Sequence, residues 1–433
     1  MKDLLGVIVA GGAGTRMAGL GDTPKALLPI GGRPLLQRQL EAMADAGIPE
    51  VLIATGHGAQ RLEAELPTLT PPGLGVRLSR DPFPAGSGGC LAHACAEVDR
   101  TLLVLFGDVV MHMDLGALVA FHRSRPAQAT AVVHPNDHPY DSDLVQLDPR
   151  GRVLALHRKP HPDGLRVRNL VTAGAFVLEP GIIATIPTDR PQDLVHDILH
   201  GALDLGVYGY TTSEYLKDMG TPRRYAQVEQ DWQSGRVQGS HRSQPRATAF
   251  LDRDGTLNEH VGLVYAPAQL RLIPGAAPAV RLLNQAGVRV VLTTNQPVLA
   301  RGLCDATELE GIHAQLERLL AAEGAYLDEI QACPHHPDGG FEGEVPSLKI
   351  PCTCRKPGVG LIHAAEATQA FDPQDSAVFG DTWRDLEMAR TAGLPCHVVG
   401  AAQGIDPDDP APRHRDLLHG VRAWLATRPG AQT

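Results

Sequence analysis

Short apolar runs alternate along this chain with longer stretches in which apolar residues recur at helical spacing. In the first half, runs at 5–10, 51–55, 101–106 and 131–133 predict strands, and the periodicity at 34–46 and 115–124 predicts helices. In the second half, runs at 248–251, 288–293, 377–379 and 396–399 predict strands, with helices expected at 276–286, 306–323, 384–392 and about 414–427. Such alternation is typical of βαβ units, so each half is predicted to be an α/β domain with a mostly parallel sheet and helices on both faces.

The pattern breaks once, in a polar stretch rich in Gly and Ser at 234–245. A helical stretch ends before it near Trp232 and a new strand follows it, so the stretch is predicted to be a linker. A chain of 433 residues is also too long for one ordinary core. We therefore expect a domain at 1–232, a linker at 233–246 and a second domain at 247–433.

Composition narrows the function classes. The apolar fraction is 43% and the net charge is −10, without a basic stripe, so nucleic acid is not an expected partner. An aromatic fraction of 4% also argues against stacking on single strands. No apolar run reaches the ~20 residues that span a bilayer, and the first strand begins without a signal segment. We expect a cytoplasmic protein that does not enter membranes.

Two carboxylates, Asp252 and Asp254, follow the apolar strand that ends at Leu251. At the end of a strand the backbone curls, so both side chains can reach one pocket at the sheet edge. There Asp252 could attack a phosphoryl group while Asp254 exchanges the proton of the leaving or entering oxygen. The same residues are also compatible with an Asp-rich turn closed by Gly255.

A glycine-rich turn follows the first strand, at Gly11 to Arg16. Glycines let the backbone approach a phosphate and point several N–H groups at it. Arg16 and Lys25 add the positive charge that a triphosphate requires. The pattern is neither the P-loop nor the dinucleotide fingerprint, because the closing residues and the glycine spacing differ.

Three of the seven cysteines cluster in sequence with a histidine, in Cys333-Pro-His335 and Cys352-Thr-Cys354. A reducing compartment disfavours disulfides, so a metal site is favoured. Three thiolates and one imidazole form a closed tetrahedral set, which is typical of structural Zn²⁺. His336 is the competing imidazole, and unligated thiols are the alternative.

The N-terminal half resembles the sugar-phosphate nucleotidyltransferases over residues 1 to about 232. The resemblance rests on motifs that follow the order of that family: Gly11–Arg16, Pro24–Lys25, Gly86–Gly89, Phe106–Asp108, Arg158–Pro160, Thr172–Ala175 and Lys217–Pro222. It implies attack of a sugar 1-phosphate on the α-phosphorus of a nucleoside triphosphate. The implied catalytic cations are Arg16 and Lys25, the implied Mg²⁺ ligands are Asp108 and Asp218, and the implied binding residues are Gly11, Gly12, Gly14, Thr15, Gly88, Lys159 and Gly174.

From 246 to about 400 the chain resembles the haloacid-dehalogenase-like phosphatases, and within them the D,D-heptose 1,7-bisphosphate phosphatases and their histidinol-phosphatase relatives. The resemblance makes Asp252 the nucleophile, Asp254 the acid/base, Thr294 the phosphoryl ligand and Lys356 the neutralising cation. Mg²⁺ is expected on Asp252, the Asp254 carbonyl and Asp381, with Asp385 orienting the metal shell. Asn295, Gln296 and Arg355 are expected to bind substrate. The subfamily also implies Zn²⁺ on Cys333, His335, Cys352 and Cys354.

The two halves make sense as successive steps, because removing one phosphate from a sugar bisphosphate leaves the sugar 1-phosphate that the first half would activate. The sequence therefore predicts a bifunctional enzyme of nucleotide-activated heptose synthesis, with GMP transfer favoured. The expected partners are a nucleoside triphosphate and sugar phosphates, and a homo-oligomer stays open. The alternatives are another sugar phosphate as substrate, or a phosphatase regulated by a non-catalytic sugar-nucleotide sensor. Histidinol phosphatase is disfavoured, because a nucleotidyltransferase has no place beside it.

Overall fold

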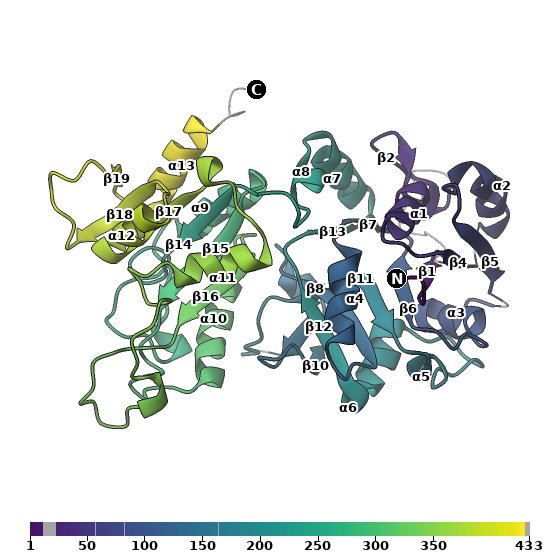
Figure 1. Ribbon diagram of the computed structural model, residues 1–433, viewed down its shortest axis with the longest axis horizontal. Helices are drawn as coiled ribbons and strands as arrows, with labels where there is room; N and C mark the ends of the chain where they lie inside the picture. The colour runs from purple at the N-terminus through teal and green to yellow at the C-terminus, as the bar shows by residue number, and fades with distance from the viewer. Residues whose placement is uncertain (12–22, 57, 82, 163, 429–433) are drawn as a thin grey trace. The chain divides into compact units, whose positions relative to one another are not determined.

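The apolar runs of the sequence form buried strands, which lie in two large sheets (Figure 1). A computed structural model describes residues 1–433 apart from 12–22, 57, 82, 163 and 429–433. It divides into two units. Unit 1 comprises Met1–His134, Val145–His157 and Thr172–His241, and unit 2 comprises Pro135–Leu144, Arg158–Val171 and Arg242–Thr433. Two segments of the N-terminal half thus belong to the unit that holds the C-terminal half.

The N-terminal half alternates strands and helices as its sequence predicts. Its elements in chain order are β1 (Leu5–Val9), β2 (Pro29–Ile30), β3 (Arg33–Pro34), α1 (Leu35–Asp45), β4 (Glu50–Thr55), α2 (Ala59–Leu69), β5 (Gly75–Arg80), α3 (Gly86–Ala94), β6 (Leu102–Phe106), β7 (Val109–His112), α4 (Leu115–Arg123), β8 (Ala129–His134), β9 (Leu144–Leu147), β10 (Val153–His157), β11 (Val171–Leu178), α5 (Pro180–Ile183), α6 (Leu203–Gly206), β12 (Val207–Thr211), β13 (Tyr215–Asp218), α7 (Pro222–Gln233) and α8 (Arg236–Gly239).

The large sheet of this half runs β10-β9-β11-β6-β1-β4-β5, with β8 paired to β11 and β12 paired to β8. Strand β1 is parallel to both β4 and β6, whereas β11 is antiparallel to β6 and β9. The sheet is therefore mixed, with β1, β4, β5 and β6 parallel to their neighbours in that run and β11 antiparallel to β6 and β9. The carboxyl ends of β1, β4, β5 and β6 meet at one edge, where ligands bind in sheets of this kind.

The C-terminal half repeats the alternation around a second sheet. Its elements are β14 (Thr248–Leu251), α9 (Ala276–Gln285), β15 (Arg289–Asn295), α10 (Ala306–Ala321), β16 (Glu329–Cys333), α11 (Gly360–Thr368), β17 (Ala377–Thr382), α12 (Trp383–Thr391), β18 (Cys396–Gln403), β19 (Arg413–His414) and α13 (Leu417–Thr427). The strands run in the order β16-β15-β14-β17-β18-β19, and every pair is parallel.

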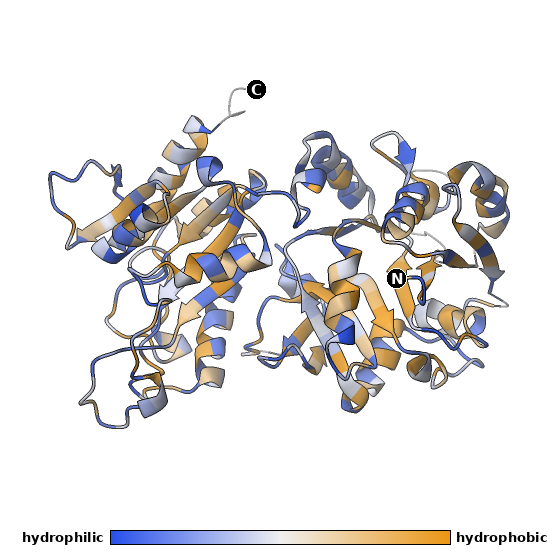
Figure 2. Ribbon diagram, viewed as in Figure 1, coloured by the Kyte–Doolittle hydropathy of each residue, from blue (hydrophilic) through white to orange (hydrophobic). Residues whose placement is uncertain are grey.

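Successive residues of β14 point to opposite faces of this sheet and enter two different cores. Ala249 and Leu251 pack in a cluster with residues of α9, α10 and α13. Phe250 packs in another cluster with residues of α11 and α12. Both faces are covered, which is why the central strands β14, β15 and β17 carry unbroken apolar runs instead of alternating apolar and polar residues (Figure 2).

The predicted strands and long helices are confirmed, and the differences lie at their ends. The stretch predicted as a linker contains one short helix, α8. The last helix begins at Leu417, because Asp416 accepts the N–H of His419 and caps it. In the part of the chain that the structure describes, every helix is too short or too polar to cross a membrane.

Candidate functional sites

The first candidate site lies at the carboxyl end of β14, where Asp252 follows the buried Leu251. The chain turns sharply here through Gly255, whose φ is +89°. A Cβ on Gly255 would lie 2.2 Å from Oδ2 of Asp381, so only glycine fits between this turn and the end of β17. The turn therefore brings the end of β14 against the carboxylate that ends the neighbouring strand.

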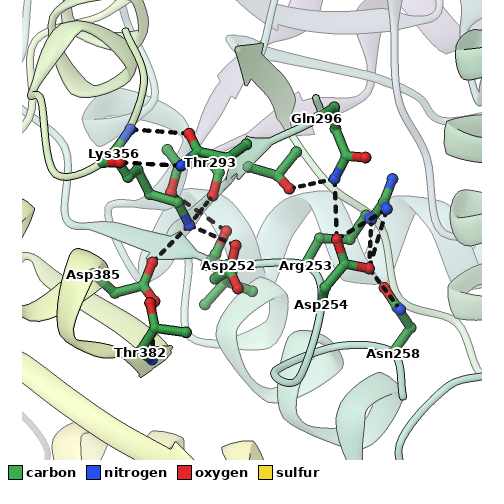
Figure 3. Close-up of polar contacts among 12 residues, drawn as sticks. Asp252, Arg253, Asp254, Asn258, Thr293, Gln296, Lys356, Thr382 and Asp385 are labelled. Carbon is green, nitrogen blue, oxygen red and sulfur yellow. Dashed lines mark hydrogen bonds and ion pairs between the residues drawn. The ribbon is translucent and has the colours of Figure 1, made fainter. Parts of the chain in front are cut away.

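A buried lysine joins the carboxylate that follows β14 to a carboxylate of α12 (Figure 3). Nζ of Lys356 donates to Oδ1 of Asp252 at 2.5 Å, to Oδ1 of Asp385 at 2.6 Å and to the carbonyl of Thr293 at 2.9 Å. The main-chain N–H of Lys356 donates to Oδ1 of Asn295 at 2.9 Å, which fixes the loop that carries the lysine. The ammonium thus contacts Asp252, and its predicted contact with a bound phosphate stays a prediction.

Asp254 has a different environment from Asp252. Arg253, whose side chain is fully buried, donates to both of its oxygens, and Asn258 and Gln296 donate at 2.9 and 3.0 Å (Figure 3). Burial alone would raise the pKa of Asp254, but Arg253 and these amides outweigh burial and lower it. Asp254 is therefore held as a carboxylate in this state, with its oxygens fixed in direction.

The carboxyl groups on the other side of the site hold protons more tightly. Burial raises the pKa of Asp252 to about 7 despite the charge of Lys356, and burial with the nearby Asp385 raises the pKa of Asp381 to about 6. Like charges in a low-dielectric site disfavour ionisation. The raised pKa values of Asp252 and Asp381 therefore indicate that these carboxyl groups have too little positive charge around them. Oδ1 of Asp381 is buried, and no hydrogen-bond donor among the described residues reaches it.

These same carboxylates could hold a metal ion. Oxygens of Asp252, Asp381 and Asp385 lie within 4.8 Å of one another, and all three residues are buried. Carboxylate oxygens are the ligands that Mg²⁺ prefers, and a cation would supply the missing positive charge. The Asp254 carboxylate is not in this group, and its predicted metal contact is through the main-chain carbonyl. Asp385 also accepts from the N–H and hydroxyl of Thr382, which fixes its direction.

The other residues predicted for this site come from the ends of two further elements. Thr294, Asn295 and Gln296 lie where β15 ends, and the Gln296 amide donates to the Thr294 hydroxyl at 2.8 Å. Arg355 precedes Lys356, and its guanidinium donates to the carbonyl of His335 at 3.2 Å. The structure thus brings Thr294 and Gln296 to Asp254, and Asn295 to the Lys356 loop. Their predicted contacts with substrate stay predictions.

A second group with metal-binding potential lies beside this loop. The sulfur atoms of Cys333, Cys352 and Cys354 are 3.2 to 3.6 Å apart. Nδ1 of His335 lies 3.3 Å from the sulfur atom of Cys354. All four ligand atoms lie within 4.8 Å of one another. Two sulfur atoms bound to the same tetrahedral Zn²⁺ ion would be about 3.8 Å from each other. His336 accepts the N–H of Asp338 instead and is not in the group, so the geometry favours His335.

In the N-terminal half, the predicted Mg²⁺ ligands contact cations of the chain. Nζ of Lys25, in the 3-10 helix η2 (Lys25–Leu27), lies 2.9 Å from Oδ2 of Asp108, which follows β6. Asp218, at the end of β13, accepts from Nη1 of Arg224 at 2.9 and 3.0 Å. Pairing of β13 with β7 and a hydrogen bond from Met219 to the Asp108 carbonyl bring the two aspartates into one region. Binding of Mg²⁺ by both stays a prediction.

Most of the predicted phosphate-binding turn falls outside the described residues: Gly12, Gly14, Thr15 and Arg16. Gly11 is described, and it lies against an acidic residue that the sequence analysis did not select. A Cβ on Gly11 would lie 3.2 Å from Oδ2 of Asp81, which follows β5. Burial raises the pKa of this half-buried carboxyl to about 6. Among the residues that the structure describes, none donates a hydrogen bond to it.

The remaining predicted binding residues are dispersed. Gly88 lies in α3, and its N–H donates to the carbonyl of Gln192 at 2.8 Å. Gly174 in β11 has a φ of +70°, and a Cβ there would lie 2.8 Å from Val109, so packing alone explains this glycine. Lys159 belongs to unit 2, where its ammonium contacts Asp141 at 2.7 Å. No measured contact brings these three residues together.

Sequence reasoning missed residues that act on the predicted ones. Arg253 is the middle residue of the Asp252–Asp254 motif, and a charged residue between two carboxylates at the end of a buried strand was a usable signal. Arg224 lies in α7, six residues after Asp218. Its contact with Asp218 depends on how α7 packs, and the spacing of apolar residues in the sequence does not predict that packing. Asp81, between β5 and Gly86–Gly89, offered no such local signal, because its position against Gly11 depends on how the strands are placed in the sheet.

Comparison with known proteins matches the chain to two families, whose matched residues overlap at 193–235. Residues 5–235 match the family of nucleotidyl transferases, and residues 193–393 match haloacid dehalogenase-like hydrolases. The chain is 39% identical over 150 residues to a D-glycero-beta-D-manno-heptose-1,7-bisphosphate 7-phosphatase of Rhodopseudomonas palustris, covering 35% of this chain and 81% of that protein. It is 40% identical over 152 residues to the corresponding D-glycero-D-manno-heptose-1,7-bisphosphate 7-phosphatase of Thermosynechococcus vestitus, covering 34% and 76%. It is 31% identical over 230 residues to a mannose-1-phosphate guanylyltransferase of Mycobacterium tuberculosis, covering 52% of this chain and 63% of that protein.

Proposed function

We propose that this chain catalyses two successive steps. It belongs to the nucleotidyl transferase family and, through its C-terminal half, to the heptose-1,7-bisphosphate 7-phosphatases among the haloacid dehalogenase-like hydrolases. The first step removes the 7-phosphate from D-glycero-D-manno-heptose 1,7-bisphosphate. The second transfers GMP from GTP to the resulting heptose 1-phosphate. The phosphatase step is supported by the buried Asp252–Lys356–Asp385 arrangement. Beside it lies a buried oxygen of Asp381 that accepts no hydrogen bond from the described residues.

In the phosphatase step, an Asp252 oxygen attacks phosphorus while the bond to the sugar oxygen breaks. A proton from Asp254 passes to that sugar oxygen, which leaves as a hydroxyl. Water then attacks the aspartyl phosphate, Asp254 takes its proton, and Asp252 is released with free phosphate. Asp254 is a base as the structure holds it; the negative charge of a bound phosphate favours its protonation for the first half of the cycle.

Metal ions fit both groups described above. Mg²⁺ held by Asp252, Asp381 and Asp385 would neutralise charge on the phosphoryl group. Zn²⁺ held by the three cysteines and His335 would be structural, because four protein ligands leave no open position. Its effect would be to hold Arg355 and Lys356, which directly follow Cys354, in place at the phosphatase site.

In the transfer step, an oxygen of the sugar 1-phosphate attacks the α-phosphorus of the triphosphate and pyrophosphate leaves. Lys25 and Arg16 would stabilise the charge that develops on the α-phosphate and on the leaving group. Asp108 and Asp218 would hold Mg²⁺. In that state Lys25 would no longer pair with Asp108, and Arg224 would no longer pair with Asp218. Both of these ion pairs are partly exposed, so exchanging them for a metal costs little.

The preference for guanine is supported by Asp81 and by the name of the mycobacterial relative. Guanine carries two adjacent N–H donors, at N1 and the 2-amino group, and a carboxylate can accept both. Asp81 lies against Gly11 at the sheet edge, and no described residue uses its oxygens. Adenine, cytosine and uracil offer a single donor at the corresponding edge, so they would leave one oxygen of a half-buried carboxylate unpaired.

Nucleotidyl transfer to heptose 1-phosphate with each of GTP, ATP, CTP, UTP and dTTP tests the base assignment. We expect GTP to have the highest kcat/KM, and Asp81→Asn to lower kcat/KM for GTP by about tenfold or more, the value of one good hydrogen-bonded pair. The same variant should leave ATP almost unaffected. Equal loss with every triphosphate would show that Asp81 supports the fold of the site, and preference for another base would refute GMP transfer.

A further inference from the structure

Two segments of the N-terminal half, 135–144 and 158–171, belong to unit 2, and we call them together the arm. They connect strands β8, β9, β10 and β11 along the chain. Their main anchor is Glu317, on α10 of the phosphatase half. Arg168 donates to it through Nε at 2.8 Å and through Nη2 at 3.0 Å, and the N–H of Asn169 donates at 2.8 Å.

Glu317 is only 3% exposed, although α10 otherwise packs apolar residues such as Ile312 and Leu316 in the core. A buried carboxylate is costly unless it is paired and hydrogen-bonded. Within the described part of the chain, every hydrogen bond that Glu317 accepts comes from the arm. The phosphatase fold itself gives Glu317 no partner, so its contribution is to hold the arm.

The rest of the contact between the arm and α10 is loosely packed. A cavity of about 190 Å³ lies between them, lined among others by Tyr140, His161, Leu165 and Ala314. Beside the Glu317 anchor, the described residues also form hydrogen bonds from the Tyr140 hydroxyl to the Arg318 carbonyl and from Arg168 to the exposed Glu310. The bidentate, part-buried Arg168–Glu317 pair is thus a strong attachment of the arm to α10.

Hydrogen bonds lead from this anchor to Lys159. The Asn169 side chain donates to the carbonyl of Asn136, the second residue of the first segment of the arm. Asp141 and Asp143 in that same segment accept from the side chain and the main-chain N–H of Lys159, at 2.7 and 3.0 Å. The Lys159–Asp141 pair is exposed, so a sugar phosphate can displace Asp141 at little cost.

We propose that Glu317, a residue of the phosphatase half, is a positioning residue for nucleotidyl transfer, because it fixes the arm that carries Lys159. The proposal rests on the proposed function, in which Lys159 pairs with the phosphate of the sugar. Through this anchor a helix of the phosphatase half holds the segment of the transferase sequence that carries Lys159.

The test is steady-state kinetics of the full-length chain carrying Glu317→Gln, which keeps the shape of the side chain and removes its charge. We expect the KM for the sugar 1-phosphate in nucleotidyl transfer to rise about tenfold, the value of one good charged hydrogen bond. The KM for GTP and the phosphatase kcat/KM should stay within twofold of wild type. Glu310→Gln is the matched control, because this exposed carboxylate contacts the same guanidinium from the same helix, and it should change none of these constants.

Lys159→Met separates this proposal from the function it rests on. If Glu317 acts through Lys159, the double variant should have the KM of Lys159→Met alone. A raised KM in Lys159→Met with an unchanged KM in folded Glu317→Gln overturns the proposal and leaves the role of Lys159 intact. Unchanged values in both variants overturn both. If Glu317→Gln does not fold, Arg168→Met must give the same selective rise, and an unselective loss of both activities would contradict positioning.

Discussion

At the scale of single residues, the phosphatase site depends on an imbalance of charge. Asp252, Asp381 and Asp385 are buried together with one lysine, and the raised pKa values of Asp252 and Asp381 express the shortage of positive charge. Asp252 and Asp254 are two residues apart, yet their pKa values move in opposite directions. Different environments for neighbouring carboxylates are what distinct nucleophile and acid/base roles require.

Replacing the nucleophile should separate the two activities. Asp252→Asn keeps the shape of the side chain but removes the attacking oxygen's charge, so phosphate release should fall by on the order of a thousandfold or more. Nucleotidyl transfer from a supplied sugar 1-phosphate should stay near wild type. Asp408→Asn, in an exposed loop, is the control for an Asp-to-Asn change in the same half. A fall in transfer of more than a few-fold would argue against independent sites.

At this scale the sequence predicts residues that belong to ordered motifs, and it misses residues whose role depends on distant partners. Lys356 could be assigned because it stands in a recognisable motif, and its ammonium does contact Asp252. Asp81 could not, because its importance comes from lying against Gly11, 70 positions earlier in the chain. The joint position of β1 and β5 in one sheet creates that contact, and local patterns carry no information on it.

At the scale of elements, the turn after β14 sets the distance between two strands of the phosphatase site. Gly255→Ala would place a Cβ 2.2 Å from an Asp381 oxygen. We expect phosphatase kcat to fall by on the order of a hundredfold, because displacement of a catalytic group by about 1 Å has that effect. Gly262→Ala is a close control: its φ of +86° is almost the same, and no atom lies within 4 Å of the added Cβ. Equal losses would attribute the effect to backbone strain alone.

The loop that presents Lys356 depends on the cysteine–histidine group. We expect about one tightly bound Zn²⁺ per chain in metal analysis of protein washed with a weak chelator. Cys352→Ser should release it, lower the thermal stability of the C-terminal half and reduce phosphate release, since Cys354 directly precedes Arg355 and Lys356. Cys304→Ser changes a thiol outside this group and should keep the metal. Wild-type protein without bound Zn²⁺ would refute the assignment.

Elements were predicted well where their pattern is local. Strands β14, β15, β17 and β18 appear where apolar runs predict them, because buried parallel strands are apolar on both faces, whereas β16 and β19 were not predicted. The reversed direction of β11 and the membership of 135–144 and 158–171 in unit 2 were not predicted. Both depend on which distant segments pair, and the buried Arg168–Glu317 contact joins residues 149 positions apart.

At the scale of the whole molecule, one chain combines a phosphatase and a nucleotidyl transferase whose proposed reactions follow each other. The phosphatase would make the sugar 1-phosphate that the transferase consumes. The arm gives this fusion a physical basis beyond shared expression, because transferase sequence completes the hydrogen bonds of a buried phosphatase residue. The full-length chain is therefore the form in which both activities should be measured.

The most direct measurement supplies the purified chain with D-glycero-D-manno-heptose 1,7-bisphosphate, GTP and Mg²⁺ and follows phosphate, pyrophosphate and nucleotide sugar together. We expect one phosphate and one pyrophosphate for each GDP-heptose formed, with phosphate appearing first. Asp252→Asn should make no GDP-heptose from the bisphosphate and should recover when heptose 1-phosphate is supplied. Phosphate release without any nucleotide sugar, from either substrate and with every triphosphate, would contradict the central claim that one chain performs both steps.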